Sequence, residues 1–267
     1  MSVYDVNGNI ISSGGGGSDE PHLSTPWVSS MHRGYSSSTV HENTLEAFYR
    51  AYLNEAQWIE VDARLSSDEI YISNHDATVT VGGVTYTIAN ETAETLTSLV
   101  LSTDPTYGAC HIPTLESVLK MCAVTGLRAN IDCKAINATT LAQLVVDCGM
   151  SGRCSYANTS TANASTILGI DPNAGFIFSY SASNITAWLG ALTDYHTRQR
   201  SFAWSSSISY DALRTTRAAG FKYLASEVNS SNYAQKMPFN PDMVEFQANQ
   251  DCKAINKTYL DNIDLGL

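Results

Sequence analysis

Charged residues with a spacing of two occur in two of the apolar runs of this sequence. Glu60 and Asp62 lie in one run, and Asp132 and Lys134 lie in another. If these runs are β-strands, side chains two apart point the same way, so the two carboxylates of the first run share one face. Two like charges that point into a protein are costly unless a cation lies between them. The spacing therefore indicates a bound metal ion at Glu60 and Asp62, with the acid Asp132 and the base Lys134 of the second run beside it.

The types of these side chains narrow the choice of metal ion. Glu60, Asp62 and Asp132 offer only oxygen atoms as ligands. Such a set suits a hard divalent cation, Ca²⁺ or Mg²⁺, better than zinc or copper. We expect these three carboxylates to hold the metal.

Two histidines and two cations accompany the carboxylates. His32 and His75 each follow an apolar run, and histidine exchanges protons near neutral pH, so they can serve as general base and general acid. Arg33 and Lys134 supply the positive charge that an anionic group would need in an acidic chain. Together with a metal ion, these residues predict phosphoryl transfer.

The elements that would position these residues alternate between strands and helices from Pro26 onward. We predict eight strands, at 27–31, 58–64, 70–74, 127–133, 154–157, 175–179, 202–205 and 221–225. Helices are predicted at 44–54, 115–125, 140–148, 184–193 and 210–219. This pattern predicts an α/β fold, a (β/α)8 TIM barrel whose active site gathers at the carboxyl ends of the strands.

The chain divides into three parts in this interpretation. Residues 1–25 form a short N-terminal arm with a Gly-rich linker, and residues 26–232 form the barrel, with an irregular insertion at 76–114 after the third strand. Residues 233–267 are expected to be a C-terminal extension. The hexapeptide DCKAIN occurs at 132–137 and again at 251–256, and we interpret the repeat as a chance match.

Composition excludes several classes of partner. The 267 residues include 15 Lys and Arg against 26 Asp and Glu, so the formal net charge of −11 disfavours nucleic acid. No run approaches the roughly 18 apolar residues of a membrane span, and the six cysteines form no CxxC pair that would indicate zinc. No signal peptide is visible, so we expect a protein of the bacterial cytoplasm or of a virion. The arm or the extension would mediate any homo-oligomer.

The order of these motifs resembles the glycerophosphodiester phosphodiesterases, TIM-barrel enzymes similar to phosphatidylinositol phospholipase C. The similarity covers about residues 27–135 and runs through HRG at 32–34, ENTLEAF at 42–48, EVD at 60–62, HD at 75–76, IPTLE at 112–116 and IDCK at 131–134. It implies a metal-dependent hydrolase of lipid metabolism that releases glycerol 3-phosphate and an alcohol from a glycerophosphodiester.

The resemblance also implies roles for the residues already named. It assigns acid–base catalysis to His32 and His75, a divalent cation to Glu60, Asp62 and Asp132, the substrate phosphate to Arg33 and Lys134, and a further place in the site to Glu42. In this chemistry one histidine deprotonates a hydroxyl beside the diester, the other protonates the departing alcohol, and water opens the cyclic phosphate. The family usually has Glu where Asp132 stands, so the cation would lie nearer that strand or bind through water.

Two alternatives remain open at this stage. The Gly-rich arm and the Ser-, Thr- and Asn-rich composition would suit a phage tail-associated enzyme that acts on teichoic acid, the glycerol-phosphate polymer of bacterial cell walls. A binding module that recognises such a polymer without cleaving it is the second. The presence of both histidines, all three carboxylates and both cations favours an enzyme.

Overall fold

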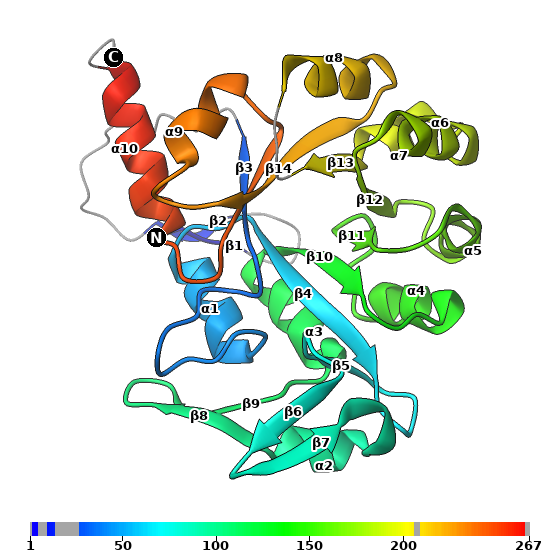
Figure 1. Ribbon diagram of the computed structural model, residues 1–267. Coiled ribbons are helices and arrows are strands. Elements are labelled where there is room, and N and C mark those ends of the chain that lie inside the picture. Colours follow the sequence, from blue (N-terminus) through cyan, green and yellow to red (C-terminus); the bar gives the residue numbers. More distant parts are fainter. Residues whose placement is uncertain (1, 5–9, 14–26, 206–208, 265–267) are drawn as a thin grey trace.

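A closed barrel of parallel strands forms the centre of the protein (Figure 1). The computed structural model describes residues 2–4, 10–13, 27–205 and 209–264. Within them the barrel closes because β10 pairs in parallel with both β4 and β11. The eight barrel strands are β3 (Val28–Met31), β4 (Trp58–Leu65), β10 (Arg128–Cys133), β11 (Cys154–Ala157), β12 (Gly175–Ser179), β13 (Phe202–Ser205), β14 (Lys222–Val228) and β15 (Met243–Phe246). The predicted α/β barrel is confirmed.

Helices cover the outside of the barrel (Figure 1). They are α1 (Leu45–Leu53), α3 (Leu115–Thr125), α4 (Ala138–Asp147), α5 (Thr161–Ile170), α6 (Ala182–Ala191), α7 (Tyr195–Gln199), α8 (Tyr210–Ala218), α9 (Tyr233–Lys236) and α10 (Cys252–Asp264), with a 3-10 turn, η2, at Met237–Phe239. Local sequence sets where several of them begin: the side chains of Thr44, Thr114 and Ser181 accept hydrogen bonds from backbone N–H groups three residues on. Of the described elements, α5 and α10 are the long helices that the sequence pattern did not predict.

One predicted barrel strand lies outside the barrel wall. The run predicted at 70–74 forms β5 (Tyr71–Ser73), which pairs antiparallel with β4. The connection from β4 is short, and a parallel strand would need a crossover of a dozen or more residues. Instead, β15 completes the barrel by pairing in parallel with β14 and β3. The barrel therefore continues past residue 232, and the predicted boundary of the C-terminal extension is corrected.

The predicted insertion consists of two hairpins and a short helix. They are β6 (Thr78–Val81) with β7 (Val84–Thr87), the 3-10 turn η1 (Ile88–Asn90), α2 (Ala93–Ser98), and β8 (Val100–Asp104) with β9 (Gly108–His111). A small apolar cluster around Ile72, Leu96 and Ile112 joins this unit to β5. The insertion lies beside the carboxyl end of β4 (Figure 1).

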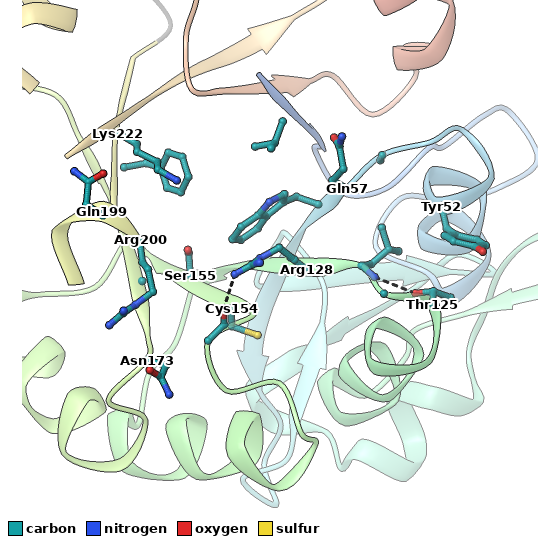
Figure 2. Close-up of a pocket in the computed structure, with 18 residues that line it drawn as sticks. Tyr52, Gln57, Thr125, Arg128, Cys154, Ser155, Asn173, Gln199, Arg200 and Lys222 are labelled. Carbon is teal, nitrogen blue, oxygen red and sulfur yellow. Dashed lines mark hydrogen bonds between the residues drawn. The ribbon is translucent and has the colours of Figure 1, made fainter. Parts of the chain in front are cut away.

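The barrel lumen is layered along its axis. A middle layer of apolar side chains includes Ala157, Ile177 and Leu224. Along β10 the alternation of side chains places Arg128 at the amino end and Asp132 at the carboxyl end of the same strand face. Figure 2 shows the amino end, where cationic side chains gather. The carboxylates predicted to bind metal lie at the other end.

Three further findings bear on the sequence analysis. All six cysteines are buried and free. No helix of the described chain is long and apolar enough to cross a membrane. Residues 2–4 and 10–13 pair as a hairpin, β1 (Ser2–Tyr4) with β2 (Ile10–Ser13), and the rest of the predicted arm lies outside the described residues.

Candidate active site

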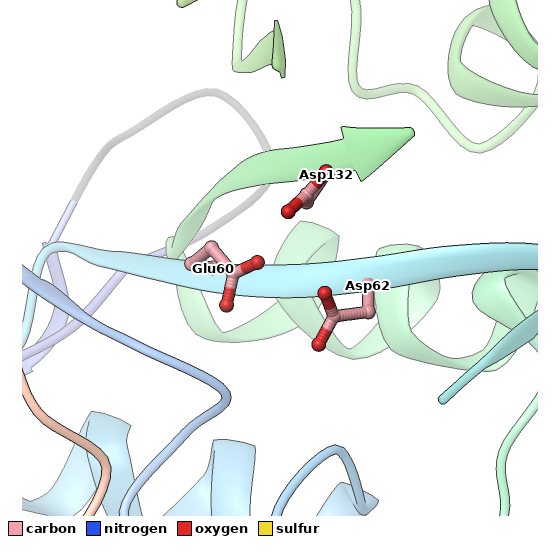
Figure 3. Close-up of side chains that lie close together, drawn as sticks. All are labelled: Glu60, Asp62 and Asp132. Atoms are coloured by element: carbon pink, nitrogen blue, oxygen red, sulfur yellow. The ribbon is translucent and has the colours of Figure 1, made fainter. Parts of the chain in front are cut away.

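Three carboxylates converge at the carboxyl ends of β4 and β10 (Figure 3). Asp62 and Asp132 are paired across the two strands, and Glu60 lies two residues before Asp62 on the same face. One oxygen from each carboxylate lies within 4.8 Å of the others. Glu60 and Asp62 are almost fully buried. The predicted cluster is thus assembled from the residues that the spacing singled out.

The electrostatics of this cluster favour a cation. Burial and the negative charge of Asp62 raise the pKa of Glu60 well above its usual range. On β15, burial and the charge of Asp132 raise the pKa of Glu245 to about 7. Several buried carboxylates in one place repel one another unless positive charge is added. The oxygen-only donor set and this repulsion both fit a hard divalent cation.

Arg33 joins three of the carboxylates of the site. Its backbone N–H donates to Glu60 Oε2 at 3.0 Å, and its Nη1 donates to Glu42 Oε1 at 2.9 Å. Its Nε lies 3.4 Å from Asp62 Oδ2. The hydrogen bond to Glu42 raises the pKa of Arg33 although burial opposes the charge. Glu42 contacts the guanidinium of Arg33 and is outside the group of three converging carboxylates.

Lys134 bridges the other side of the cluster. Its Nζ lies 2.7 Å from Asp132 Oδ2 and 3.2 Å from Asp62 Oδ1. Burial disfavours the charged amine, but the hydrogen bond to Asp132 prevails and raises the pKa of Lys134. The site therefore holds two fixed positive charges at its rim, in a chain with an acidic net charge.

The two predicted catalytic histidines flank the carboxylates from different loops. His32 Nε2 lies 3.9 Å from Glu60 Oε2, and burial together with the charge of Arg33 lowers the pKa of His32. The ring of His75 is held by a 2.8 Å hydrogen bond between its Nδ1 and Asp76 Oδ1. His32 lines a cavity of about 150 Å³ on one side, and His75 lines a cavity of about 220 Å³ on the other.

Asn43 is a site residue to which the sequence analysis gave no role. Its Nδ2 donates to Asp62 Oδ2 at 2.6 Å, and its Oδ1 accepts from the Asp62 backbone N–H and from Ser73 Oγ. The side chain is buried, and its backbone is left-handed, with φ 58°. Arg33 has the same unusual conformation, with φ 57°. The signal was present, because Asn43 is the second residue of the ENT motif.

Other residues near the carboxylates come from β10 and from later strands. Asn158, after β11, donates to Asp132 Oδ1 at 2.6 Å, and Asn130 lies 3.5 Å from Glu245 Oε2. Trp204 and Leu224 form part of the apolar wall of the cavity beside His32. The sequence could have revealed Asn130, because it lies two residues before Asp132 and so on the same strand face. Glu245 was hidden because its strand was not predicted.

Comparison with known proteins adds to this geometry. The sequence matches the Glycerophosphoryl diester phosphodiesterase family over residues 32–251. No curated protein matched the sequence. Among solved structures, a glycerophosphoryl diester phosphodiesterase from Parabacteroides distasonis has a TM-score of 0.73 and 19% identity, covering 88% of this chain and 87% of that one.

Two other solved structures show the same fold. A putative glycerophosphoryl diester phosphodiesterase from Silicibacter pomeroyi has a TM-score of 0.72 and 16% identity, over 92% of this chain and 96% of that one. A phosphodiesterase from Oleispira antarctica, solved with the product sn-glycerol-3-phosphate, has a TM-score of 0.68 and 21% identity, over 86% of this chain and 96% of that one.

Proposed function

The chain belongs to the glycerophosphoryl diester phosphodiesterase family, and we propose that it is a metal-dependent enzyme that hydrolyses glycerophosphodiesters to glycerol 3-phosphate and an alcohol. One observation carries this proposal. Three converging carboxylates lie beside His32, Arg33 and Lys134 near the carboxyl ends of barrel strands, and His75 lines a cavity together with Asn43, which donates to Asp62. The sn-glycerol-3-phosphate bound to the Oleispira antarctica relative supports the choice of product.

The carboxylates would hold a divalent cation, either Ca²⁺ or Mg²⁺. When bound to Glu60, Asp62 and Asp132, such an ion would supply charge that offsets the negative oxygens of the phosphate. Arg33 and Lys134 would contact the phosphate from the rim. We propose that Glu42 acts on the substrate through Arg33, because its carboxylate fixes the guanidinium at 2.9 Å.

The histidines would divide the proton transfers between them. We propose that neutral His32 accepts the proton of a free hydroxyl beside the diester, whose oxygen then attacks phosphorus. His75 donates a proton to the departing alcohol oxygen as its bond to phosphorus breaks. In a second step water attacks the cyclic phosphate and gives a proton to His75, while His32 returns its proton to the oxygen released.

The environments of the two rings support this assignment. The lowered pKa of His32 favours its neutral, proton-accepting form at neutral pH. Asp76 Oδ1 accepts a 2.8 Å hydrogen bond from Nδ1 of His75 and so fixes the orientation of the ring. Arg64 donates to the backbone oxygen of His75 at 2.9 Å and 2.6 Å and so holds the loop that carries the ring.

The test is release of glycerol 3-phosphate from glycerophosphocholine by the purified protein. We expect turnover that EDTA abolishes and that added Ca²⁺ or Mg²⁺ restores. The His75→Ala variant should lose about 10²- to 10⁴-fold in rate, and His196→Ala, which changes an exposed histidine on α7, should keep its activity. Equal turnover with and without EDTA, or in His75→Ala, would refute the proposal.

A glycerol-phosphate polymer of the teichoic acid type is the alternative substrate. The observation that favours it is the presence of two cavities at the candidate site, one of about 150 Å³ beside Glu60 and Asp132 and one of about 220 Å³ beside His75. Such a pair could accept chain on either side of the phosphate. The same assay with the polymer decides, because polymer cleavage without cleavage of glycerophosphocholine would assign the activity to the polymer.

A further inference from the structure

A larger cavity opens at the amino end of the barrel, opposite the proposed active site (Figure 2). Its volume is about 510 Å³, in the range of sites that bind small molecules. Trp58, Arg128, Phe202 and Lys222, each the first residue of a barrel strand, line it. The apolar layer around Leu224 lies between this cavity and the carboxylates. It is therefore a separate space with its own chemistry.

The lining of this cavity is cationic. Arg128, Arg200 and Lys222 contribute to it, and no Asp or Glu is found among its described lining residues. None of the three cations forms an ion pair with a carboxylate in the described part of the chain, and Arg128 and Arg200 donate instead to the neutral backbone oxygens of Gly152 and Pro172. In a protein of net charge −11, this is an uncompensated patch of positive charge.

The cations are fixed in place by neutral groups. The guanidinium of Arg128 lies 5.0 Å from the Trp58 ring centre and also donates to the backbone oxygen of Gly152. Lys222 Nζ lies 5.7 Å from the Phe202 ring centre. Aromatic faces position these cations without neutralising them. Burial lowers the pKa of Arg128, which means that its charge is costly here without an anion nearby.

A buried hydroxyl provides a second, independent indication of a ligand. Ser155, from β11, lines the cavity and is only 1% exposed, yet its Oγ has no hydrogen-bond partner among the described residues. The facing position is Gly175, where a Cβ would lie 2.7 Å from that Oγ. Only glycine leaves room beside the hydroxyl at this position. Buried polar atoms are normally satisfied, so this hydroxyl calls for a partner.

We propose that this cavity binds a small phosphate-bearing anion. Guanidinium groups and an ammonium group can surround a tetrahedral oxyanion from several directions, and the Ser155 hydroxyl can donate to a further oxygen. The Nε atoms of Arg128 and Arg200 are buried and lack hydrogen-bond acceptors among the described residues, so they have donors to offer. The site does not depend on the function proposed for the opposite end.

The competing occupant is a segment of the chain itself. In the sequence, residues 14–26 come shortly before Val28, which lines the cavity, and they include Asp19 and Glu20. A small phosphate-bearing anion is the better occupant, because phosphate oxygens would satisfy the arginine forks and the hydroxyl together. The double variant Asp19→Asn, Glu20→Gln distinguishes the two occupants. If the segment filled the cavity through its acidic side chains, an added anion would bind only in this variant.

Calorimetric titration of the full chain with pyrophosphate tests the proposal at constant ionic strength. All measurements use the Lys134→Met background, which weakens anion binding at the opposite end. We expect saturable binding that Lys222→Met weakens about tenfold or more, and that Ser155→Ala weakens by a smaller factor. Lys120→Met, which removes an exposed cation of α3, should bind like the background protein.

Several outcomes would overturn the proposal. The first is the absence of saturable binding up to about 10 mM pyrophosphate, because a dissociation constant above that value is too weak for a specific site. The second is equal affinity for pyrophosphate in Lys222→Met and Lys120→Met, and the third is equally tight binding of citrate. The fourth is binding that appears only after Asp19 and Glu20 are neutralised. Thermal unfolding of each variant shows whether it folds. Because activity is not the readout, failure here leaves the phosphodiesterase proposal untouched.

Discussion

At the scale of single residues, Asp132 and Asp251 begin identical hexapeptides but meet different partners. Asp132 accepts from Lys134 Nζ at 2.7 Å and from Asn158 Nδ2 at 2.6 Å, inside the candidate site. Asp251 accepts from the Ala254 backbone N–H at 2.9 Å, at the start of α10. The two aspartates therefore offer a matched pair for mutation.

We predict that Asp132→Asn abolishes most activity and that Asp251→Asn does not. Changes to residues that only support metal ligands cost about 10–100-fold, so loss of a ligand should cost at least about 100-fold in kcat/KM. Asp251→Asn should lose at most about 1 kcal/mol of stability, because Asn is also a good helix cap. Steady-state kinetics measures the activity of the two variants, and urea unfolding measures their stability. Equal loss of activity in the two variants would contradict the assignment of Asp132.

The pH dependence of stability tests the buried carboxylates. Without metal, Glu245 keeps its proton up to about pH 7 when folded but releases it above about pH 4.5 when unfolded. The folded state then binds more protons in this window, so its stability falls as pH rises from 4.5 through 7. His32, with a lowered pKa, works in the opposite direction below pH 6.5.

We predict that Glu245→Gln removes this fall. In EDTA, the difference in unfolding free energy between wild type and the variant should shift by at most about 3 kcal/mol between pH 5 and pH 8, with wild type relatively more stable at pH 5. Added Ca²⁺ or Mg²⁺ should stabilise wild type more at pH 8, because protons compete with the cation. Parallel pH profiles for the two proteins would count against the raised pKa.

At the scale of elements, a glycine fixes how α1 meets the loop that carries His32 and Arg33. Gly34 follows His32 and Arg33 and has φ 81°. A Cβ at Gly34 would lie 2.8 Å from the backbone carbon of Ala47, in α1. The Tyr35 N–H donates to the Ala47 backbone oxygen at 2.9 Å, so loop and helix are already in contact. The HRG motif therefore needs glycine for close approach as well as for its backbone conformation.

We predict that Gly34→Ala destabilises the protein by about 2 kcal/mol or more and reduces activity, since the loop must move. Gly126→Ala is the matched control. Gly126 has φ 85° at the end of α3, but nothing lies within 4 Å of a Cβ there. The Gly126→Ala variant should lose only about 1 kcal/mol of unfolding free energy, which is the cost of holding alanine in the left-handed conformation. Urea unfolding of both proteins separates the two effects, and equal losses would rule out the contact with Ala47.

The repeated hexapeptide shows how context decides an element. The first copy ends β10, and its last residue, Asn137, caps α4 by accepting from the Thr140 N–H. In the second copy, residues 252–256 are the first residues of α10. The same residues thus form the end of a strand and the start of a helix. Propensity is a weak prior, and the neighbouring strands of the barrel outweigh it.

At the scale of the whole molecule, β15 brings a segment from late in the sequence into the barrel wall. It pairs with β14 on one side and β3 on the other, and it carries Glu245 into the site. Barrel closure removes open sheet edges, which otherwise favour aggregation. The last strand is therefore needed for the fold as a whole.

We predict that a chain ending at residue 232 does not fold into a soluble protein, because β14 and β3 would lose their partner. Removal of residues 1–25 should leave cooperative unfolding, since β3 begins at Val28. Circular dichroism and solubility of the two truncated chains, beside the full chain, measure this. A folded 1–232 chain would show that the first seven barrel strands suffice without β15.

The sequence by itself determined the barrel class, most of its strands and the central carboxylates. Those predictions rest on local rules: alternation puts Glu60 and Asp62 on one face, and parallel strands bring their carboxyl ends together. Tertiary structure alone decided that β5 leaves the barrel and that β15 replaces it. Strand pairing between distant residues leaves no local pattern, so Glu245, the partners of Asn43 and the cationic cavity at the amino end became visible only in the folded chain.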